Sequence, residues 1–169
     1  MDTQRPKWRE ASISTANSWR FFCFRDPVEC AQYLLYQRPY RDHMVYELTR
    51  TVDAEGDRVY SEMNSADWWW ETQNRLPPVA TIVPLICRLD KTQLTDFSGD
   101  KKAQPIYLTI GNIHSSLQNK YSNLTQIVLT FLPAPVKFQD NSASGDRAHR
   151  DINQQVLCDN PKIVLEPIT

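Results

Sequence analysis

One carboxylate stands at a position where folded proteins often place chemistry. Asp90 follows a nearly continuous apolar run over residues 80–87 and closes the segment that ends at Leu89. Such a run predicts a buried strand, and a carboxylate at the end of that strand is well placed to face a cleft. A plain aspartate that caps a turn or meets solvent fits the same position. The residues alone therefore leave both interpretations open.

The polar segment after Asp90 carries no second recognisable site. Asp96 and Asp100 lie in it, but their spacing does not match a calcium-binding loop. Residues 97–101 have the composition of a solvated turn, with a weak anion-binding nest as the alternative. The rest of the chain contains no dinucleotide fingerprint, P-loop, nucleophile elbow or H-E-x-x-H motif. The common nucleotide-dependent, serine-hydrolase and zinc-protease classes are thereby excluded at motif level.

The cysteines and histidines do not predict a metal centre. No two of them form a C-x-x-C pair or another short zinc-ligand spacing. The residues concerned are Cys23, Cys30, Cys87 and Cys158, and His43, His114 and His149. We expect the four cysteines to be reduced packing residues or surface thiols.

Composition favours an ordinary globular protein without a basic tail. The chain has 169 residues, 41% of them hydrophobic and 23% charged, and a net charge of −1. Nucleic-acid-binding domains commonly carry a basic face, and none is visible at this level. No apolar segment is long enough to span a membrane. The first ten residues lack the apolar segment of a secretory signal, so an intracellular protein is expected.

The first 78 residues predict a mixed helical and hairpin arm after a disordered N-terminus. Residues 1–18 are polar and aperiodic. Asp26 and Pro27 are typical of the cap and first position of a helix, which Pro39 ends. Residues 44–60 predict a hairpin with its turn at 53–57. A helix capped by Ser65 should then run to the two prolines at 77–78.

Three consecutive tryptophans, Trp68, Trp69 and Trp70, lie on this predicted helix. Neighbours on a helix are about 100° apart, so at least one of the three must be partly exposed. Their large apolar area favours packing of the arm onto the following domain. Base stacking or wedging into DNA is the alternative interpretation.

Residues 79–169 predict three antiparallel strands and then a helix. Apolar runs at residues 79–89, 105–110 and 126–132 indicate the strands. A 3.6-residue periodicity from about residue 144 indicates the helix, with Pro161 breaking or restarting it. The predicted fold class is α+β, with the arm over 19–78 and the strand-and-helix unit over 79–169.

Several segments together carry a family resemblance. They are SADWWWETQ from residue 65, ATIVPLI from 80, DKTQLTDFSGDKKA from 90, PIYLTIGNI from 105 and FLPAPVKF from 131. With this series the chain resembles the Plavaka transposases of mushroom-forming fungi, which are related to the CACTA group of DNA transposons. The resemblance covers roughly residues 20–168 and is strongest over residues 65–138. Departures from the family pattern are Leu89, Gln104 and Pro161. The motif positions are Trp68, Trp69, Trp70, Asp90, Lys91, Thr92, Gly99, Asp100, Lys101, Gly111 and Asn112.

The resemblance implies a DDE-type DNA transposase with a ribonuclease H-like core. In such a protein Asp90 is the first of three acidic residues that hold catalytic Mg²⁺, and the full-length parent cleaves and joins DNA at transposon ends. The second and third acidic residues belong to later segments, so we expect this chain to be a fragment, inactive alone, that binds Mg²⁺ poorly. Expected partners are DNA and either a second copy or a full-length transposase, in the nucleus. A non-catalytic DNA- or protein-binding remnant and an inert structural domain are the alternatives.

Overall fold

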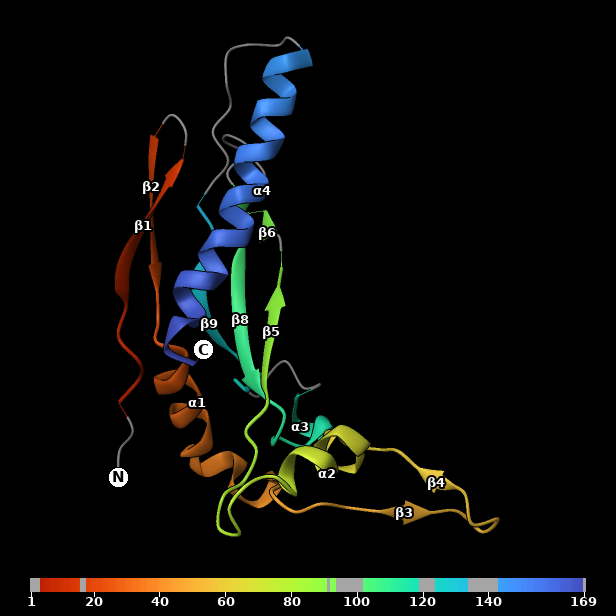
Figure 1. Ribbon diagram of the computed structural model, residues 1–169. Coiled ribbons are helices and arrows are strands. Elements are labelled where there is room, and N and C mark those ends of the chain that lie inside the picture. Colours follow the sequence, from red (N-terminus) through yellow and green to blue (C-terminus); the bar gives the residue numbers. More distant parts are fainter. Residues whose placement is uncertain are drawn as a thin grey trace.

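A five-stranded antiparallel sheet forms the centre of the molecule, in the order β1-β2-β9-β8-β5 (Figure 1). The computed structural model describes residues 4–15, 18–90, 92–93, 102–118, 124–133 and 143–168. The strands are β1 (Arg9–Thr15), β2 (Ser18–Phe24), β5 (Leu85–Leu89), β8 (Pro105–Ile110) and β9 (Ile127–Phe131). The three strands predicted from residue 79 onward are therefore adjacent and antiparallel, which confirms that part of the prediction.

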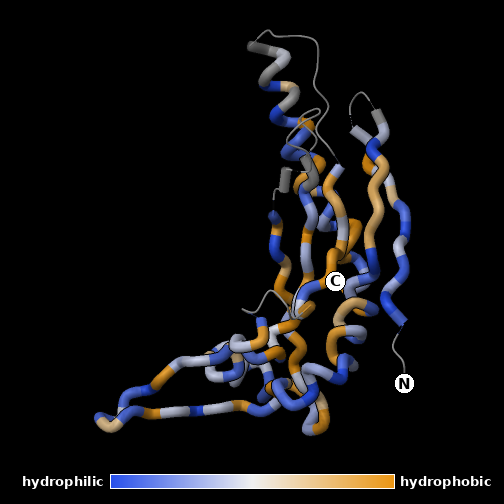
Figure 2. Tube along the Cα trace, turned by 180° about the vertical axis from the view of Figure 1, so that it is seen from behind, coloured by the Kyte–Doolittle hydropathy of each residue, from blue (hydrophilic) through white to orange (hydrophobic). Residues whose placement is uncertain are grey.

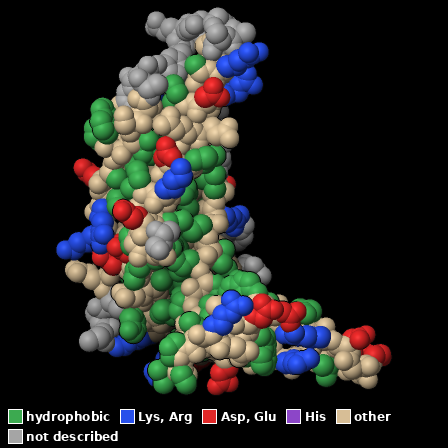
Figure 3. Space-filling model, viewed as in Figure 1, with side chains coloured by type: hydrophobic (Ala, Val, Ile, Leu, Met, Phe, Trp, Pro, Cys, Tyr) green, Lys and Arg blue, Asp and Glu red, His purple; other side chains and the backbone are tan. Residues whose placement is uncertain are grey.

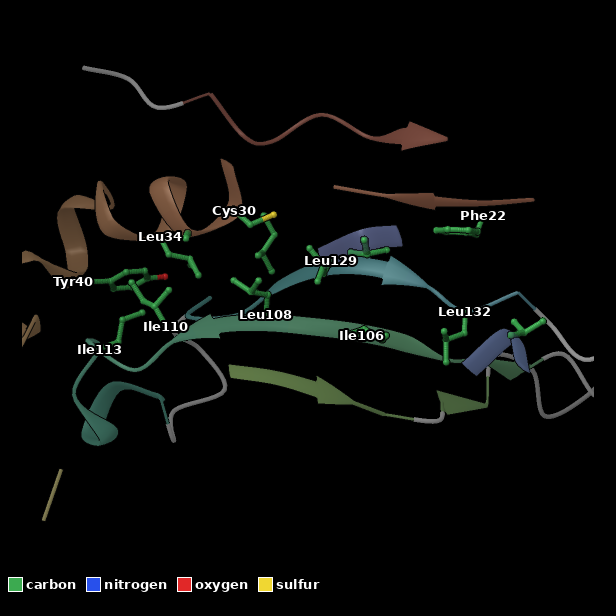
Figure 4. Packing of buried hydrophobic residues seen from close by; sticks show 14 of the residues in the cluster. Phe22, Cys30, Leu34, Tyr40, Ile106, Leu108, Ile110, Ile113, Leu129 and Leu132 are labelled. Atoms are coloured by element: carbon green, nitrogen blue, oxygen red, sulfur yellow. The ribbon is translucent and has the colours of Figure 1, made fainter. Parts of the chain in front are cut away.

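Two helices pack against this sheet, α1 (Pro27–Leu35) and α4 (Ala143–Leu165). The Asp26 carboxylate caps α1 by accepting hydrogen bonds from the backbone N–H groups of Val28 and Glu29, at 2.8 and 3.2 Å, so the predicted start of this helix is confirmed. Figure 4 shows Cys30 and Leu34 of α1 pointing toward the sheet.

The main hydrophobic core draws on both halves of the chain. Each fully buried aliphatic side chain in such a core stabilises the fold by about 1.5–3 kcal/mol. Figure 2 shows hydrophobic stretches on the central strands and on α1. The buried members of the cluster are Ile13, Phe22, Cys30, Ala31, Leu34, Tyr40, Ile106, Leu108, Ile110, Ile113, Ile127, Leu129, Leu132, Val156 and Val164. Several of these precede residue 78, in the segment that the sequence analysis assigned to an arm.

The N-terminus differs from the sequence-based prediction of disorder over residues 1–18. Arg9–Thr15 forms β1, which pairs with β2 from Arg9↔Phe24 to Thr15↔Ser18. The signal was a period of two, since Ala11 and Ile13 face the core with Thr15 while the residues between them are more exposed. The strand was not predicted because polar residues alternate with the apolar ones. Such an alternation is typical of a half-buried antiparallel edge strand.

A projection extends from one end of the sheet, at the lower right of Figure 1, and contains β3 (Thr51–Val52), β4 (Arg58–Val59) and α2 (Asp67–Gln73). Within it, Gly56 adopts a φ of 93° in the turn between β3 and β4, a left-handed conformation that glycine reaches without a Cβ penalty. The predicted 44–60 hairpin is thus confirmed only near its turn. The short elements are η1 (Arg38–His43), β3 (Thr51–Val52), β4 (Arg58–Val59), η2 (Met63–Ser65), α2 (Asp67–Gln73), β6 (Thr92–Gln93), β7 (Lys102–Ala103), α3 (Ser115–Gln118) and η3 (Glu166–Ile168).

The predicted start of the first strand and the predicted cap of the tryptophan helix are both wrong. Strand β5 begins at Leu85 rather than 79, because the Pro84 carbonyl instead accepts a hydrogen bond from the N–H of Gly111 at 2.8 Å. Ser65 does not cap α2; its hydroxyl closes the preceding turn, and Ala66 is the N-cap.

Helix α4 continues through Pro161 without a break. A proline there removes one helical hydrogen bond. The buried side chains of Asn160 and Val164 flank this point and hold the helix against the protein. Tertiary packing therefore overrides the local signal. No helix in the described part of the chain has the length and apolar character needed to cross a bilayer.

Candidate functional site: the end of strand β5

Strand β5 delivers Asp90 to one end of the sheet. The register pairs Leu89 with Ile106, and the Asp90 backbone N–H donates a hydrogen bond to the Pro105 carbonyl at 3.2 Å. The Asp90 residue is exposed. Among the described residues its carboxylate has no ion pair or hydrogen bond with another side chain. Asp90 is thus fixed by its backbone while its carboxylate is available to a ligand.

The surroundings of Asp90 are open. Strand β5 is the last in the sheet order, and Leu89 is 51% exposed although its partner Ile106 is buried. Beyond Asp90 the chain returns through the small β6–β7 ladder, in which Thr92 pairs with Ala103. Of the neighbouring motif positions, Lys91, Gly99, Asp100 and Lys101 lie outside the described residues.

The carboxylate chemistry suits Mg²⁺, which prefers oxygen ligands. Within the described residues, however, no group of three or more His, Cys, Asp or Glu side chains converges as a metal site would require. Asp90 alone does not fit the pair of ions used in two-metal cleavage of DNA. We therefore derive no catalytic step through a metal from these residues.

Gly111 and Asn112 lie at the opposite end of β8 from Asp90. The Asn112 side chain is 0% exposed, and its Nδ2 donates to the carbonyls of Val45 and Ile82, both at 3.0 Å. Its backbone carbonyl accepts from the N–H of Val45 at 2.7 Å. This one residue joins three segments that are far apart in the sequence.

Gly111 permits the same close approach. A Cβ atom added there would lie 2.7 Å from Met63 Sδ and 3.1 Å from Pro84 Cβ, closer than packed atoms tolerate. Gly111 and Asn112 therefore act as a structural junction, which we call the arm junction together with Val45, Met63, Ile82 and Pro84. The structure does not bring this junction together with Asp90.

The tryptophans belong to the projection rather than to the main core. Trp69 is 0% exposed and Trp68 is 47% exposed, with ring centroids 5.7 Å apart. None of the three joins the main hydrophobic cluster, so the expected packing of this run onto the strands after residue 79 is wrong. The prediction that at least one would be partly exposed is confirmed. Gln73 instead connects α2 to the segment that follows it. Its Nε2 donates a hydrogen bond to the Ala80 carbonyl, and its Oε1 accepts one from the Ile82 N–H.

A histidine close to the arm junction has a capping role. His114 Nδ1 accepts from the Ser116 N–H at 3.2 Å, and its Nε2 lies 3.3 Å from Glu62 Oε1. The Glu62 carboxylate also accepts from the hydroxyl and the N–H of Ser115, at 2.6 and 3.2 Å. These bonds satisfy the free N–H groups at the start of α3, so the group is explained by the local structure.

All four cysteines are free thiols, as expected. Cys30 is the buried one, and burial raises its pKa to about 12. Cys87 on β5 is an exposed residue, and desolvation by neighbouring atoms raises the pKa of its thiol. Both groups are therefore thiols rather than reactive thiolates at neutral pH.

The structure contains a cleft that the sequence analysis did not predict. It lies between the N-terminal segment and α1 and has a volume of about 610 Å³. We call it the N-terminal cleft. The available signal was the alternation of cations with an aromatic residue at Arg5, Lys7, Trp8 and Arg9, which was interpreted as part of a disordered tail. Elsewhere, on the face seen in Figure 3, acidic and basic side chains are interspersed without a large patch of either sign.

In a comparison with known protein families, a family model described as Plavaka transposase matches residues 1–169. No curated protein and no solved structure matches the chain significantly.

Proposed function

The chain belongs to the Plavaka transposase family, and from this premise we propose that it acts on DNA as a transposase-related protein. In this proposal Asp90 is the first acidic residue of a DDE-type site on a ribonuclease H-like sheet. The fungal origin, the relation to CACTA elements and a nuclear location belong to the same proposal.

The placement of Asp90 is the observation that carries the proposal. Strands β5, β8 and β9 are consecutive neighbours in an antiparallel sheet, and the long helix α4 follows them in the chain. Asp90 comes directly after the first of these strands, with an exposed carboxylate free of described partners. This order supports a ribonuclease H-like arrangement. The β1–β2 hairpin extends the sheet beyond β9 and is an addition to it.

We also propose that this chain alone does not cleave DNA. Cleavage with two metal ions needs several carboxylates that activate water and stabilise the leaving oxygen, and the described residues bring one. A second copy of the chain or a full-length transposase is the partner that we propose for it. Whether the chain is a fragment of a longer protein stays a prediction.

The test combines binding and cleavage of a labelled duplex that carries a transposon-end sequence. Wild type and Asp90→Asn should both bind DNA at low salt, and neither should cut it with Mg²⁺ or Mn²⁺. Asp42→Asn, another exposed aspartate, is the matched control. Metal-dependent cutting that is lost only in Asp90→Asn would show that the chain is an active nuclease. Absence of any DNA binding would contradict the proposed action on DNA.

A further inference from the structure

We propose that the N-terminal cleft binds single-stranded nucleic acid, with phosphates on Arg5 and Lys7 and a base against Trp8 and Tyr36. The inference rests on the proposed function only in that the chain acts on DNA; the cleft lies apart from Asp90. The cleft includes Arg9 of β1 at one edge of the sheet, whereas Asp90 follows β5 at the other edge (Figure 1). The lining residues are Gln4, Arg5, Pro6, Lys7, Trp8 and Arg9, with Glu29, Gln32, Tyr33 and Tyr36 from α1.

The charges of the cleft favour an anion. Arg9 is already paired, with Asp26 at 3.0 Å and Glu29 at 2.7 Å, so the one carboxylate that lines the cleft has a cationic partner. Arg5 and Lys7 are exposed and have no ion pair within the described residues. Two free cations therefore remain at the cleft, a charge that phosphate groups complement.

A buried arginine, Arg25, adds to the positive charge near the cleft. Arg25 donates from Nε to the Pro6 carbonyl at 3.0 Å and from Nη1 to the Val128 carbonyl at 2.6 Å. Neither partner is a carboxylate, so its positive charge is not cancelled by these bonds. Burial lowers the pKa of Arg25, and the nearby charge of Arg5 lowers it further. An anion bound beside Arg5 would relieve this repulsion.

The aromatic side chains of the cleft are accessible to a base that stacks on them. The Arg25 guanidinium lies 3.7 Å from the centroid of the Trp8 ring, and Phe131 lies 5.9 Å from it, centroid to centroid. These contacts hold the indole in place while it remains partly exposed. Tyr33 lies in the last turn of α1 and Tyr36 is its C-cap, with Tyr36 63% exposed. Accessible aromatic rings beside free cations are the elements with which proteins hold unpaired bases.

The same features discriminate against other occupants. In a duplex the faces of the bases are stacked on one another, so rings inside a cleft reach them only in a single strand. An acidic peptide would use the cations but not the rings. The volume of about 610 Å³ is within the range of about 300–1,000 Å³ typical of pockets for small organic ligands. It suits one or two nucleotides of a strand.

Fluorescence anisotropy with a labelled twelve-nucleotide oligothymidylate tests the inference on the full chain. Tyr36→Ala should weaken binding roughly 5- to 100-fold, because stacking contributes about 1–3 kcal/mol per base. Tyr46→Ala, an exposed tyrosine outside the cleft, should bind as wild type does. The pair Arg5→Ala and Lys7→Ala should reduce the slope of log affinity against log salt by about 1.4, at about 0.7 per phosphate. The pair Arg41→Ala and Arg75→Ala is its matched control.

Each other outcome has a distinct meaning. If the chain binds DNA but the cleft variants match wild type, the inference is overturned and the proposed function stands. If neither single strand nor duplex binds at low salt, the proposed function fails as well. A duplex bound with the same dependence on Tyr36, or a polyglutamate peptide that binds more tightly than the oligonucleotide, would overturn the single-strand assignment. Thermal melting of each variant checks that it is folded. Arg5, Lys7 and Tyr36 line the open cleft, so their substitution should leave the melting temperature unchanged.

Discussion

The two ends of strand β8 differ in how far their polar side chains are enclosed by the protein. At the Ile110 end, the arm junction is closed, and one buried amide and one glycine hold three segments within contact distance. At the Pro105 end, the neighbouring strand finishes in an exposed aspartate whose carboxylate has no described partner. Both ends carry residues of the same family pattern. Under the proposed function, residues of one family pattern serve folding at one end of the strand and chemistry at the other.

The distinction depends on burial, since the Asn112 side chain is enclosed, with an unpaired Oδ1, whereas Asp90 is exposed. Asn112 Nδ2 uses its hydrogen-bonding capacity inside the protein, which leaves little for a ligand. The Asp90 carboxylate oxygens accept no hydrogen bond from a described side chain, so they are available to a ligand. Substitutions at the closed end should therefore reduce stability, and substitutions at the open end should alter ligand binding at constant stability.

Trp69→Ala should have the largest effect on stability. It removes a fully buried indole and leaves a cavity, at a cost of about 3–5 kcal/mol in the free energy of unfolding. Trp68→Ala, at a half-exposed neighbour, should cost much less. Urea denaturation of both variants measures the difference. Equal losses would show that the projection does not depend on the buried ring.

Asn112→Ala comes next, at about 1–3 kcal/mol. The change leaves the part-buried carbonyls of Val45 and Ile82 without their donor, near the lower end of the about 1–3 kcal/mol that a buried unsatisfied group costs, and it also removes the unpaired Asn112 Oδ1. Asn74→Ala is the control, since Asn74 is exposed and should change stability by less than about 0.5 kcal/mol. Oligonucleotide binding by folded Asn112→Ala should match wild type. A selective loss of binding would assign the junction a role in function.

The buried thiol of Cys30 and the exposed thiols of Cys23 and Cys158 should differ in reactivity, in a way that depends on pH. Cys30 has its pKa raised from 9.0 to about 12, so at pH 8 its thiolate fraction is lower by on the order of a thousandfold. Its folded-state pKa lies above the unfolded value, so this contribution to stability is present below about pH 9 and declines by about 1.4 kcal/mol per pH unit up to about pH 12. Alkylation followed by mass spectrometry should modify Cys23 and Cys158 well before Cys30. Rapid labelling of Cys30 in the folded protein would contradict its buried position.

Much of the fold was predictable because its signals are local. The cap at Asp26 and the apolar runs of β8 and β9 specify their elements directly. The start of β5, the continuity of α4 through Pro161 and the role of Asn112 depend on partners distant in the sequence. The prediction of Asp90 at a strand end was correct for the same local reason. The N-terminal cleft was missed because its walls come together only when β1 pairs with β2 and α1 packs beside them.

Paramagnetic broadening by Mn²⁺ tests the central claim, that the open end of β8 is the chemical one. In ¹⁵N-labelled wild type, Mn²⁺ bound weakly by this single carboxylate should broaden amide signals around Asp90 and leave those of Gly111 and Asn112 unchanged. Asp90→Asn should abolish this broadening while changing the free energy of unfolding by less than about 0.5 kcal/mol. Asp42→Asn should retain it. Broadening that persists in Asp90→Asn, or that centres on the arm junction, would contradict the account.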